Sequence, residues 1–217
     1  DGNNDNDKSD SDDNDDSDDS DHEDGAGRVL TAEEVEAALP VESDLGSGWT
    51  RDPDNEDDDS DEDDDDEVNP PECRDIFENE ALESDQAEAK GSHAFKQDDF
   101  GPFADTEIRT FDELVDDDAL GGLAEALDKC DEFTTTNEDG EESKVTTETV
   151  DFPSLGEETL AFTMDVSSSV FPLKANFAAV RVGHNMVLLS NFVIGDQAPD
   201  IKQLEDLAEK TLDKLAG

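Results

Sequence analysis

The chain has 217 residues, with 66 Asp and Glu against 14 Lys and Arg, and its formal net charge is -52. A charge this negative argues against binding to nucleic-acid phosphates or to an anionic bilayer surface, because both need clustered basic side chains. Only 32% of the residues are hydrophobic, and the length fits one folded domain carrying an acidic arm.

Residues 1–27 consist almost entirely of Asp, Ser, Asn and Gly. Such a segment cannot bury enough apolar surface to offset its ordering entropy, so we predict a disordered acidic arm. Weak binding of divalent cations by the acidic runs is expected. A formed calcium loop is not, because aligning Gly25 as its sixth residue puts Ser20 and His22 at ligand positions.

Order is predicted from residue 28 onward, in a single α+β domain over 28–217. Thr31 and Glu34 have the spacing of a capping box, which predicts a short helix over 32–39. The Gly-rich turn 44-DLGSGW-49 follows and ends in the only Trp. Residues 52–68 are again strongly acidic, and we predict a solvated loop insert there because apolar sequence lies on both sides of it.

The chain holds two cysteines, Cys73 and Cys130, with no His or Cys at metal-ligand spacing around them. A zinc site is therefore poorly supported. We favour a disulfide between them, which would stabilise an exported domain by roughly 4 kcal/mol on the chain-entropy model. The alternative is two unrelated buried thiols.

Three elements are predicted in the middle of the chain. The motif 70-PPEC-73 begins a short helix, because Pro suits the first helical position. Residues 105–111 are rich in Thr, Ile and Phe and predict a strand. Apolar residues recur at helical spacing within 112–130, which predicts a helix that carries Cys130 inward; its Gly121-Gly122 pair leaves the helix start open.

The C-terminal third has the clearest periodicity. Apolar and polar residues alternate over 160–166, which predicts a strand with one buried face, and 145–152 predicts another. Residues 177–195 predict an antiparallel hairpin around a tight turn at Gly183. Asp200 caps a final amphipathic helix. Grouped strands with helices at the ends predict an α+β fold, an antiparallel sheet flanked by helices.

Three features read together resemble one family: 44-DLGSGW-49 after a capped helix, 70-PPEC-73 with a helix ending in Cys130, and 179-AVRVGHNMVLL-189 before a closing helix. They are similar to actinobacterial exported sensor-domain lipoproteins, which are related to the extracellular sensor domain of PknH-type Ser/Thr protein kinases. The resemblance covers about residues 28–217. It implies an antiparallel sheet flanked by helices, a cell-envelope location, and a cleft that binds an unidentified ligand.

The sequence also departs from that family. Gly46 stands where such lipoproteins have Pro before the Trp, and the acidic insert at 52–68 is not expected of them. The kinase sensor domain holds two disulfides, whereas this chain can form only one. No kinase motif is present, so this chain would be at most the sensing part.

Candidate ligand-binding residues are Trp49, Arg109 and Arg181. Trp49 could stack on a ligand, and a core plug is the alternative that we favour. The two arginines lie in predicted strands of a chain poor in bases, where each either pairs with a neighbouring carboxylate or anchors an anionic ligand. A catalytic role for His93 is disfavoured against a structural one, because no nucleophile motif accompanies it.

We therefore predict a non-enzymatic exported binding or sensor module, without metal or cofactor, whose partner is a small molecule or an envelope component. We expect it on the outer face of the cytoplasmic membrane, with a lipid anchor or a spanning segment upstream of residue 1. One alternative is a small secreted hydrolase. Another is an acidic interaction protein that binds cations or basic proteins through its acidic runs.

Overall fold

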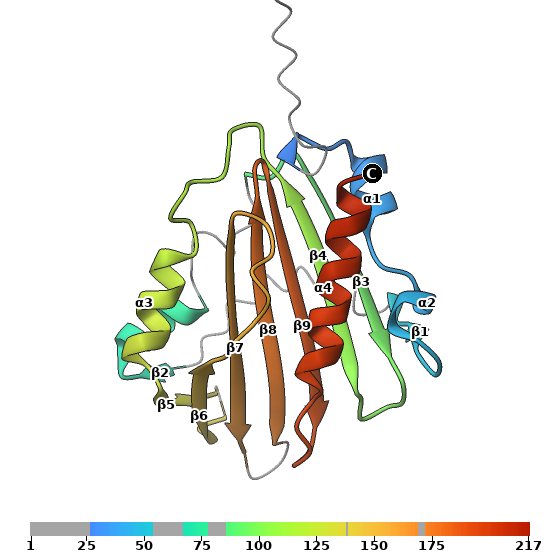
Figure 1. Cartoon of the computed structure of the whole chain (residues 1–217). Helices are drawn as coiled ribbons and strands as arrows, with labels where there is room; N and C mark the ends of the chain where they lie inside the picture. The colour runs from blue at the N-terminus through green and yellow to red at the C-terminus, as the bar shows by residue number, and fades with distance from the viewer. Residues whose placement is uncertain (1–26, 54–66, 78–85, 138, 169–171) are drawn as a thin grey trace, which may run out of the picture.

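The structure, a computed structural model, describes residues 27–53, 67–77, 86–137, 139–168 and 172–217. Nine strands of this part of the chain form one antiparallel sheet in the order β1-β3-β4-β9-β8-β7-β6-β5-β2 (Figure 1). The strands are β1 (Thr50–Arg51), β2 (Glu67–Asn69), β3 (Ala89–Lys96), β4 (Phe103–Thr110), β5 (Glu132–Thr136), β6 (Glu142–Thr149), β7 (Glu158–Ser167), β8 (Leu173–Val182) and β9 (Asn185–Ile194). The predicted α+β class with an antiparallel sheet is confirmed.

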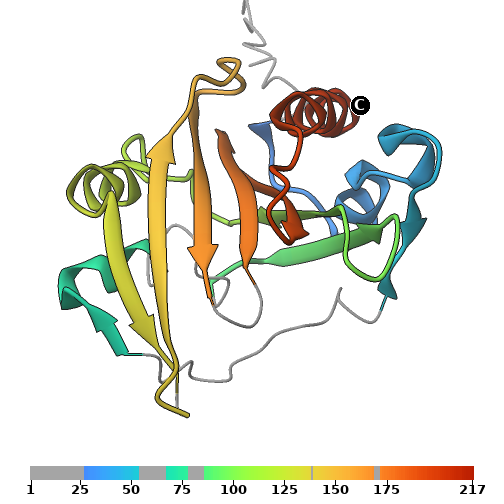
Figure 2. The ribbon, with the colours of Figure 1, turned by 90° about the horizontal axis from the view of Figure 1, so that it is seen from below.

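Helices cover parts of both faces of this sheet. They are α1 (Ala32–Ala38), α2 (Glu42–Leu45), the 3₁₀-helix η3 (Pro71–Ile76), α3 (Gly121–Lys129) and α4 (Ile201–Leu215). Figure 2 shows α1 and α4 together on one side, with α3 and η3 at the other end of the sheet. We call the side under α1 and α4 the α4 face and the opposite side the α3 face.

The α4 face holds the larger core. Val35 of α1 and Leu204 and Leu207 of α4 are buried against Ile108 and Val187 of the central strands. Full burial of each such side chain stabilises the fold by about 1.5–3 kcal/mol relative to exposure. This core therefore fixes α1 and α4 against strands β4 and β9.

A buried amide pair ties α4 to the sheet. The Nδ2 of Asn176 donates to Oδ1 of Asn191 at 2.8 Å, and the Nδ2 of Asn191 donates to the backbone oxygen of Asp200 at 2.8 Å. Asp200 is the N-cap of α4, and its side chain accepts from the Lys202 amide. Satisfied buried amides specify one arrangement, so the pair sets where α4 begins.

The α3 face holds a second core around the disulfide. Cys73 of η3 is bonded to Cys130, which ends α3, and both are buried. Leu123 and Leu127 of α3 and Phe162 of β7 belong to the same cluster. The predicted disulfide is confirmed, and it fastens η3 to α3 over the β5–β7 end of the sheet.

Most predicted elements are present with shifted ends. The capping box of Thr31 and Glu34 is formed, and α1 ends one residue earlier than predicted. The helix predicted within 112–130 begins only at Gly121, because the acidic stretch before it offers no apolar stripe to bury. The strand predicted at 105–111 starts at Phe103, and the one at 145–152 is β6, which starts at Glu142.

In strand β7 the burial of side chains differs from the prediction made from the sequence. Phe162 and Met164 face the disulfide cluster as expected, but Ala161, predicted on the open side, is buried against the α4 face. The centre of the sheet is covered on both sides. The prediction that only one face of this strand is buried was wrong, because small residues such as Ala161 do not stand out as apolar in the sequence.

The hairpin predicted around Gly183 is formed by β8 and β9. Gly183 has φ +57, and a Cβ there would overlap the carbonyl oxygen of Gly27. The amide of His184 donates to that same oxygen at 2.9 Å. Glycine is thus required both by the turn and by the close approach of the first described residues, and residues 1–26 lie outside the described part.

Both ends of the predicted acidic insert, 52–68, lie in the described part of the chain. Asp52, within the predicted bounds 52–68, is buried and pairs with Lys96 of β3, while residues 67–69 form strand β2. Residues 54–66 lie outside the described part of the chain. The edges of the predicted insert therefore belong to the folded sheet.

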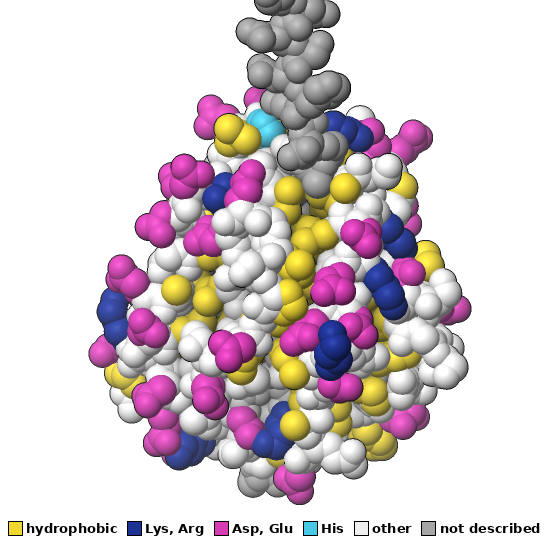
Figure 3. All heavy atoms as spheres, in the orientation of Figure 1, with side chains coloured by type: hydrophobic (Ala, Val, Ile, Leu, Met, Phe, Trp, Pro, Cys, Tyr) yellow, Lys and Arg dark blue, Asp and Glu magenta, His cyan; other side chains and the backbone are white. Residues whose placement is uncertain are grey.

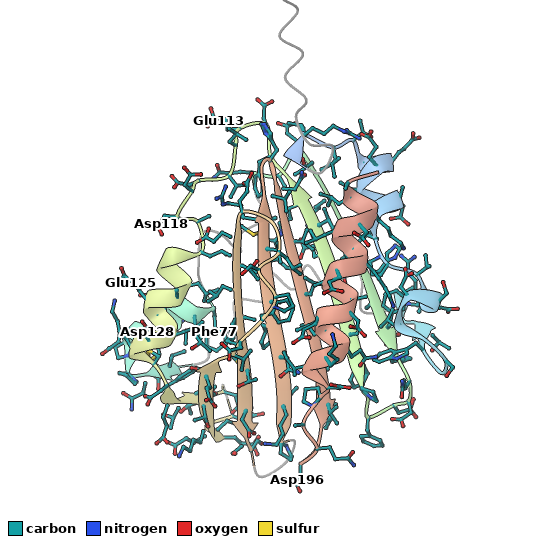
Figure 4. All side chains as sticks on the ribbon, viewed as in Figure 1. Phe77, Glu113, Asp118, Glu125, Asp128 and Asp196 are labelled. Atoms are coloured by element: carbon teal, nitrogen blue, oxygen red, sulfur yellow. A yellow bond between two sulfur atoms is a disulfide. The ribbon has the colours of Figure 1, made fainter. Side chains whose placement is uncertain are left out.

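Acidic side chains are spread over the visible surface rather than gathered in one patch (Figure 3). Figure 4 shows Glu113, Asp118, Glu125, Asp128 and Asp196 pointing away from the body of the domain, and all five are exposed. Water and salt screen the repulsion between exposed charges that are this well separated. Within the described ranges, none of the helices is long and apolar enough to cross a bilayer.

Candidate functional site

A cavity of about 360 Å³ lies on the α3 face, between α3 and strands β3, β4, β9, β8 and β7. That volume lies in the range of small-molecule sites. The side chains on its α3-face lining are Ser92, Ala94, Asp105, Glu107, Arg109, Leu123, Phe162, Phe177, Ala179, Leu188 and Ser190. Among the described helices, α3 covers the β5–β7 end of this face, and the cavity lies beside it over β4 and β9.

The pairing register brings these side chains together. Ala94, Asp105, Ser190, Phe177 and Phe162 stand directly opposite one another across β3, β4, β9, β8 and β7. Directly paired residues project from the same face of a sheet, so this row forms the cavity floor. The next row along the strands is Ser92, Glu107, Leu188 and Ala179.

One half of the cavity is apolar. The rings of Phe162 and Phe177 stack with centroids 5.0 Å apart. Leu123 contributes to the lining from α3, and Leu188 of β9 adds an apolar side chain in the next row, opposite Ala179. Offset stacked rings form a rigid apolar floor, which suits a hydrocarbon or aromatic part of a ligand.

The other half is polar and centres on Asp105. The Ser190 hydroxyl donates to Oδ2 of Asp105 at 3.1 Å across the β4–β9 pair. Burial raises the pKa of Asp105 to about 6, the Ser190 hydrogen bond opposes that rise, and the nearby charge of Asp52 adds to it. Asp52 itself pairs with Lys96 at 2.8 Å. Within the described chain, Asp105 forms no ion pair with a Lys or Arg.

We expect Asp105→Asn to raise the free energy of unfolding by about 2 kcal/mol at pH 7.5. The folded-state pKa of about 6 exceeds the ordinary 3.8, so the folded protein holds this proton more tightly than the unfolded chain does. Below pH ~4 this carboxyl group is protonated in both states and does not affect stability. As the pH rises from ~4 through ~6, the unfolded chain releases the proton first, so the free energy of unfolding falls. Urea denaturation at both ends of that window measures the difference.

The matched control is Glu148→Gln, which removes one exposed acid from β6. It relieves the same amount of overall charge repulsion but no buried charge, so its effect should stay within about 0.5 kcal/mol at either pH. Two outcomes would contradict a carboxylate that is destabilised by its burial. Asp105→Asn could stabilise the protein equally at both pH values, or it could stabilise it no more than the control does.

The two predicted arginines lie on this face. Arg109 lines the cavity and makes a two-pronged ion pair with Glu107, with contacts of 2.6 and 3.0 Å. Arg181 stands in the same row two strands away, outside the cavity lining. Its Nη1 lies 2.7 Å from Glu157, and its Nε lies 3.5 Å from Glu158. The pairing with carboxylates named in the sequence analysis is present at both positions.

Trp49 lies elsewhere. It is 5% exposed and belongs to the core of the α4 face, so the structure places it as the core plug that the sequence favoured. A ligand-stacking role for Trp49 would have to be exercised away from the cavity on the α3 face. Of the three predicted ligand-binding residues, only Arg109 lines that cavity.

His93, the one histidine considered for catalysis, is held beneath α1. Its Nδ1 donates to the backbone oxygen of Pro40 at 2.7 Å, and its Nε2 lies 3.1 Å from Glu36 of α1. The ring is 3% exposed and turned to the α4 face. His93 is among the residues that line the cavity, but both of its ring nitrogens are engaged by Pro40 and Glu36, which supports the structural reading.

His184 lies in the β8–β9 turn, where Nδ1 contacts the backbone oxygen of Phe111 at 3.0 Å, and His22 lies outside the described residues. In the described ranges, no three His, Cys, Asp or Glu side chains gather closely enough to hold a metal ion.

Asp105 and Ser190 were missed as site residues from the sequence. Residues 105–111 include Asp105, Glu107 and Arg109 at alternate positions, which places all three on one face of a strand. That alternation was the available sign of a polar strand face. Nothing local indicated that Ser190 would stand opposite Asp105, because this contact spans 85 residues.

Together these features define a disulfide-bonded α+β domain whose partly uncovered sheet face holds a ligand-sized cavity. The fold is similar to the crystal structure of the extracellular domain of PknH from Mycobacterium tuberculosis, with a TM-score of 0.60 and 13% identity. The match covers 87% of this chain and 98% of that one. The chain thus has the fold of a PknH-type sensor domain, as the sequence resemblance predicted.

A second solved structure, an uncharacterized protein of Mycobacterium smegmatis that is an ortholog of Rv0999, has a TM-score of 0.44 and 11% identity. That match covers 70% of this chain and 77% of the other. No family model and no curated protein matches the sequence.

Proposed function

We propose that this chain is a non-enzymatic sensor module that binds a small ligand in the cavity on the α3 face. The observation that carries the proposal is the cavity itself, which combines a stacked aromatic floor with a half-buried carboxylate and a serine hydroxyl. Binding sites typically have this composition, an apolar lining with a few oriented polar groups.

The cavity lining favours binding over catalysis. Its charged side chains are Asp105 and the Glu107–Arg109 pair. The one histidine in the described lining, His93, has both ring nitrogens engaged by Pro40 and Glu36 rather than by a serine. Arg109 is held by its two contacts to Glu107. The solved structure with the same fold is an extracellular domain of a kinase, which supports a sensing role rather than a chemical one.

We place the module outside the cell, held at the outer face of the cytoplasmic membrane by an anchor upstream of residue 1. The buried disulfide supports this location, because disulfides persist in oxidising compartments and are rare in the cytosol. The extracellular origin of the PknH domain supports it as well. Residues 1–27 would then connect the anchor to the domain.

A thermal-shift screen of amphiphiles and small metabolites against the full chain tests the binding function. We expect compounds that raise the melting temperature of the parent protein to lose this effect in Leu188→Trp. The larger side chain at this half-buried position enters the cavity from its floor. Bound ligand stabilises the folded state in proportion to its concentration over Kd, so the loss is measurable as a vanished shift.

Leu114→Trp is the matched control, because Leu114 is 69% exposed and lies outside the cavity lining. It should leave every shift unchanged. If no compound shifts the parent protein, or if all shifts survive in Leu188→Trp, the cavity is not a ligand site and the proposal is wrong.

A further inference from the structure

We propose that the ligand of this cavity is an organic cation, whose ammonium group pairs with Asp105 while its apolar body lies on Phe177 and Phe162. This inference rests on the proposed function, since it names the ligand class of the same site. Three features of the cavity carry it: its charge balance, the order of its side chains, and the surrounding field.

Among the described residues of the lining, Asp105 is the carboxylate that forms no ion pair. Arg109 and Glu107 neutralise each other through contacts of 2.6 and 3.0 Å on β4. At the β3 side, Asp52 and Lys96 pair at 2.8 Å. From β9, Asp105 meets only the neutral hydroxyl of Ser190. A carboxylate that is partly desolvated and has no ion-pair partner is stabilised most by a ligand that brings a positive charge.

The order of the floor residues gives the shape of the ligand. Asp105, Ser190, Phe177 and Phe162 occupy four neighbouring strands in a single row. Adjacent strands are about 4.8 Å apart, so the carboxylate and the stacked rings are separated by about 10–14 Å at the backbone. A cation with one ring or a short alkyl chain spans that distance within a cavity of about 360 Å³. The rings also tolerate a nearby cation over their faces.

The field of the whole protein favours the same sign of ligand. The chain carries a formal net charge of -52, and acidic groups are spread over the visible surface. Such a field raises the local concentration of cations and disfavours anions. An anionic ligand would have to displace Glu107 from Arg109, which would leave a carboxylate without its partner.

Calorimetric titration of the full chain with three probes of matched shape tests the inference: phenylbutylammonium, phenylbutanol and phenylbutyrate. At pH 7.5 in ~0.5 M salt, which screens weak attraction to surface acids, the ammonium probe should bind with a stoichiometry of one. Phenylbutanol should bind roughly ten-fold more weakly and phenylbutyrate more weakly still, because a charge-assisted contact is about twice as strong as a neutral one.

Asp105→Asn should weaken phenylbutylammonium roughly ten-fold and leave phenylbutanol unchanged. Lowering the pH from ~7.5 to ~5 should weaken the ammonium probe roughly ten-fold in the parent protein, because Asp105 with a pKa of about 6 becomes protonated. Glu148→Gln, which removes an exposed acid of β6, should change no affinity by more than about two-fold.

The ammonium assignment is overturned if Asp105→Asn binds phenylbutylammonium as well as the parent does, if phenylbutyrate binds more tightly, or if the ammonium probe fails to bind. Leu188→Trp separates this from failure of the binding function. If the three probes bind equally well and Leu188→Trp abolishes their binding, the cavity is a ligand site but its ligand is not specifically a cation. Binding that survives Leu188→Trp refutes the site itself.

Discussion

The double variant Cys73→Ser/Cys130→Ser is expected to lose about 4 kcal/mol of unfolding free energy relative to the oxidised parent. The disulfide joins residues 57 positions apart, so breaking it frees a long loop in the unfolded state. Both positions are buried in the cluster of the α3 face, and serine hydroxyls there would add the cost of unsatisfied polar groups. Urea denaturation under oxidising conditions measures the loss.

Two comparisons separate the covalent bond from the substitution. The parent protein reduced with a phosphine keeps its composition and should lose most of the same free energy, whereas Cys73→Ala/Cys130→Ala should fall near the reduced parent. If the reduced and the oxidised parent unfold at the same urea concentration, the disulfide does not contribute to stability. That result would also remove the support that the bond lends to an oxidising compartment.

The same variant bears on the cavity. The loop closed by the disulfide contains β3 and β4, which supply Ser92, Asp105, Glu107 and Arg109 to the cavity lining. The bond also holds η3 against α3, whose Leu123 forms one wall. Reduction should therefore weaken binding in the cavity even at temperatures at which the sheet remains folded.

Arg181→Met should destabilise the protein by about 2 kcal/mol. The Arg181 side chain is 8% exposed, and Glu157, Glu158 and Asp117 lie within 3.5 Å of its guanidinium. Glu157 also accepts from the amide of Gly183 at 2.9 Å, so the ion pair fastens the start of β7 to the β8–β9 turn. The carboxylates are partly exposed and can rehydrate, which keeps the expected loss below that of a fully buried pair.

Lys202→Met is the matched control, since it removes the same charge from an exposed residue that pairs with Glu205 and Asp206 on α4. Its effect should stay below about 1 kcal/mol. Arg181→Lys should fall between the two, because an ammonium cannot reproduce the planar guanidinium contacts. If Arg181→Met melts like the parent but loses ligand affinity, then Arg181 binds ligand and its structural role is refuted.

The local elements were predictable from the sequence where one short segment carried the whole cause. The capping box needs only Thr31 and Glu34, and the β8–β9 turn needs the positive φ that Gly183 supplies. Helix α4 was predicted from Asp200 and a regular apolar stripe. In each case the residues that cause the element to form are close together in the sequence.

Strand β3 shows why other elements were not predictable. Its sequence, Ala89–Lys96, contains Gly91 and two lysines and has no clear alternation. A Cβ at Gly91 would lie 3.0 Å from Val35 and 3.2 Å from Leu39, so the glycine lets α1 pack closely on the sheet. The strand forms because β4 pairs with it and α1 covers it, and neither cause is visible in the segment itself.

By itself, the sequence determined the α+β class, the pairing of the only two cysteines, the acidic character and the resemblance to a sensor domain, because each depends on composition, local period or a unique partner. Only the tertiary structure decided where charges lie relative to the cavity. Asp105 meets Ser190 across 85 residues of chain, and Arg109 pairs with Glu107 two residues away on the same strand. Whether a carboxylate is solvated or paired depends on what the folded chain packs around it. Among 66 acids, no local pattern distinguishes Asp105, which lies in the cavity beside a serine rather than a base.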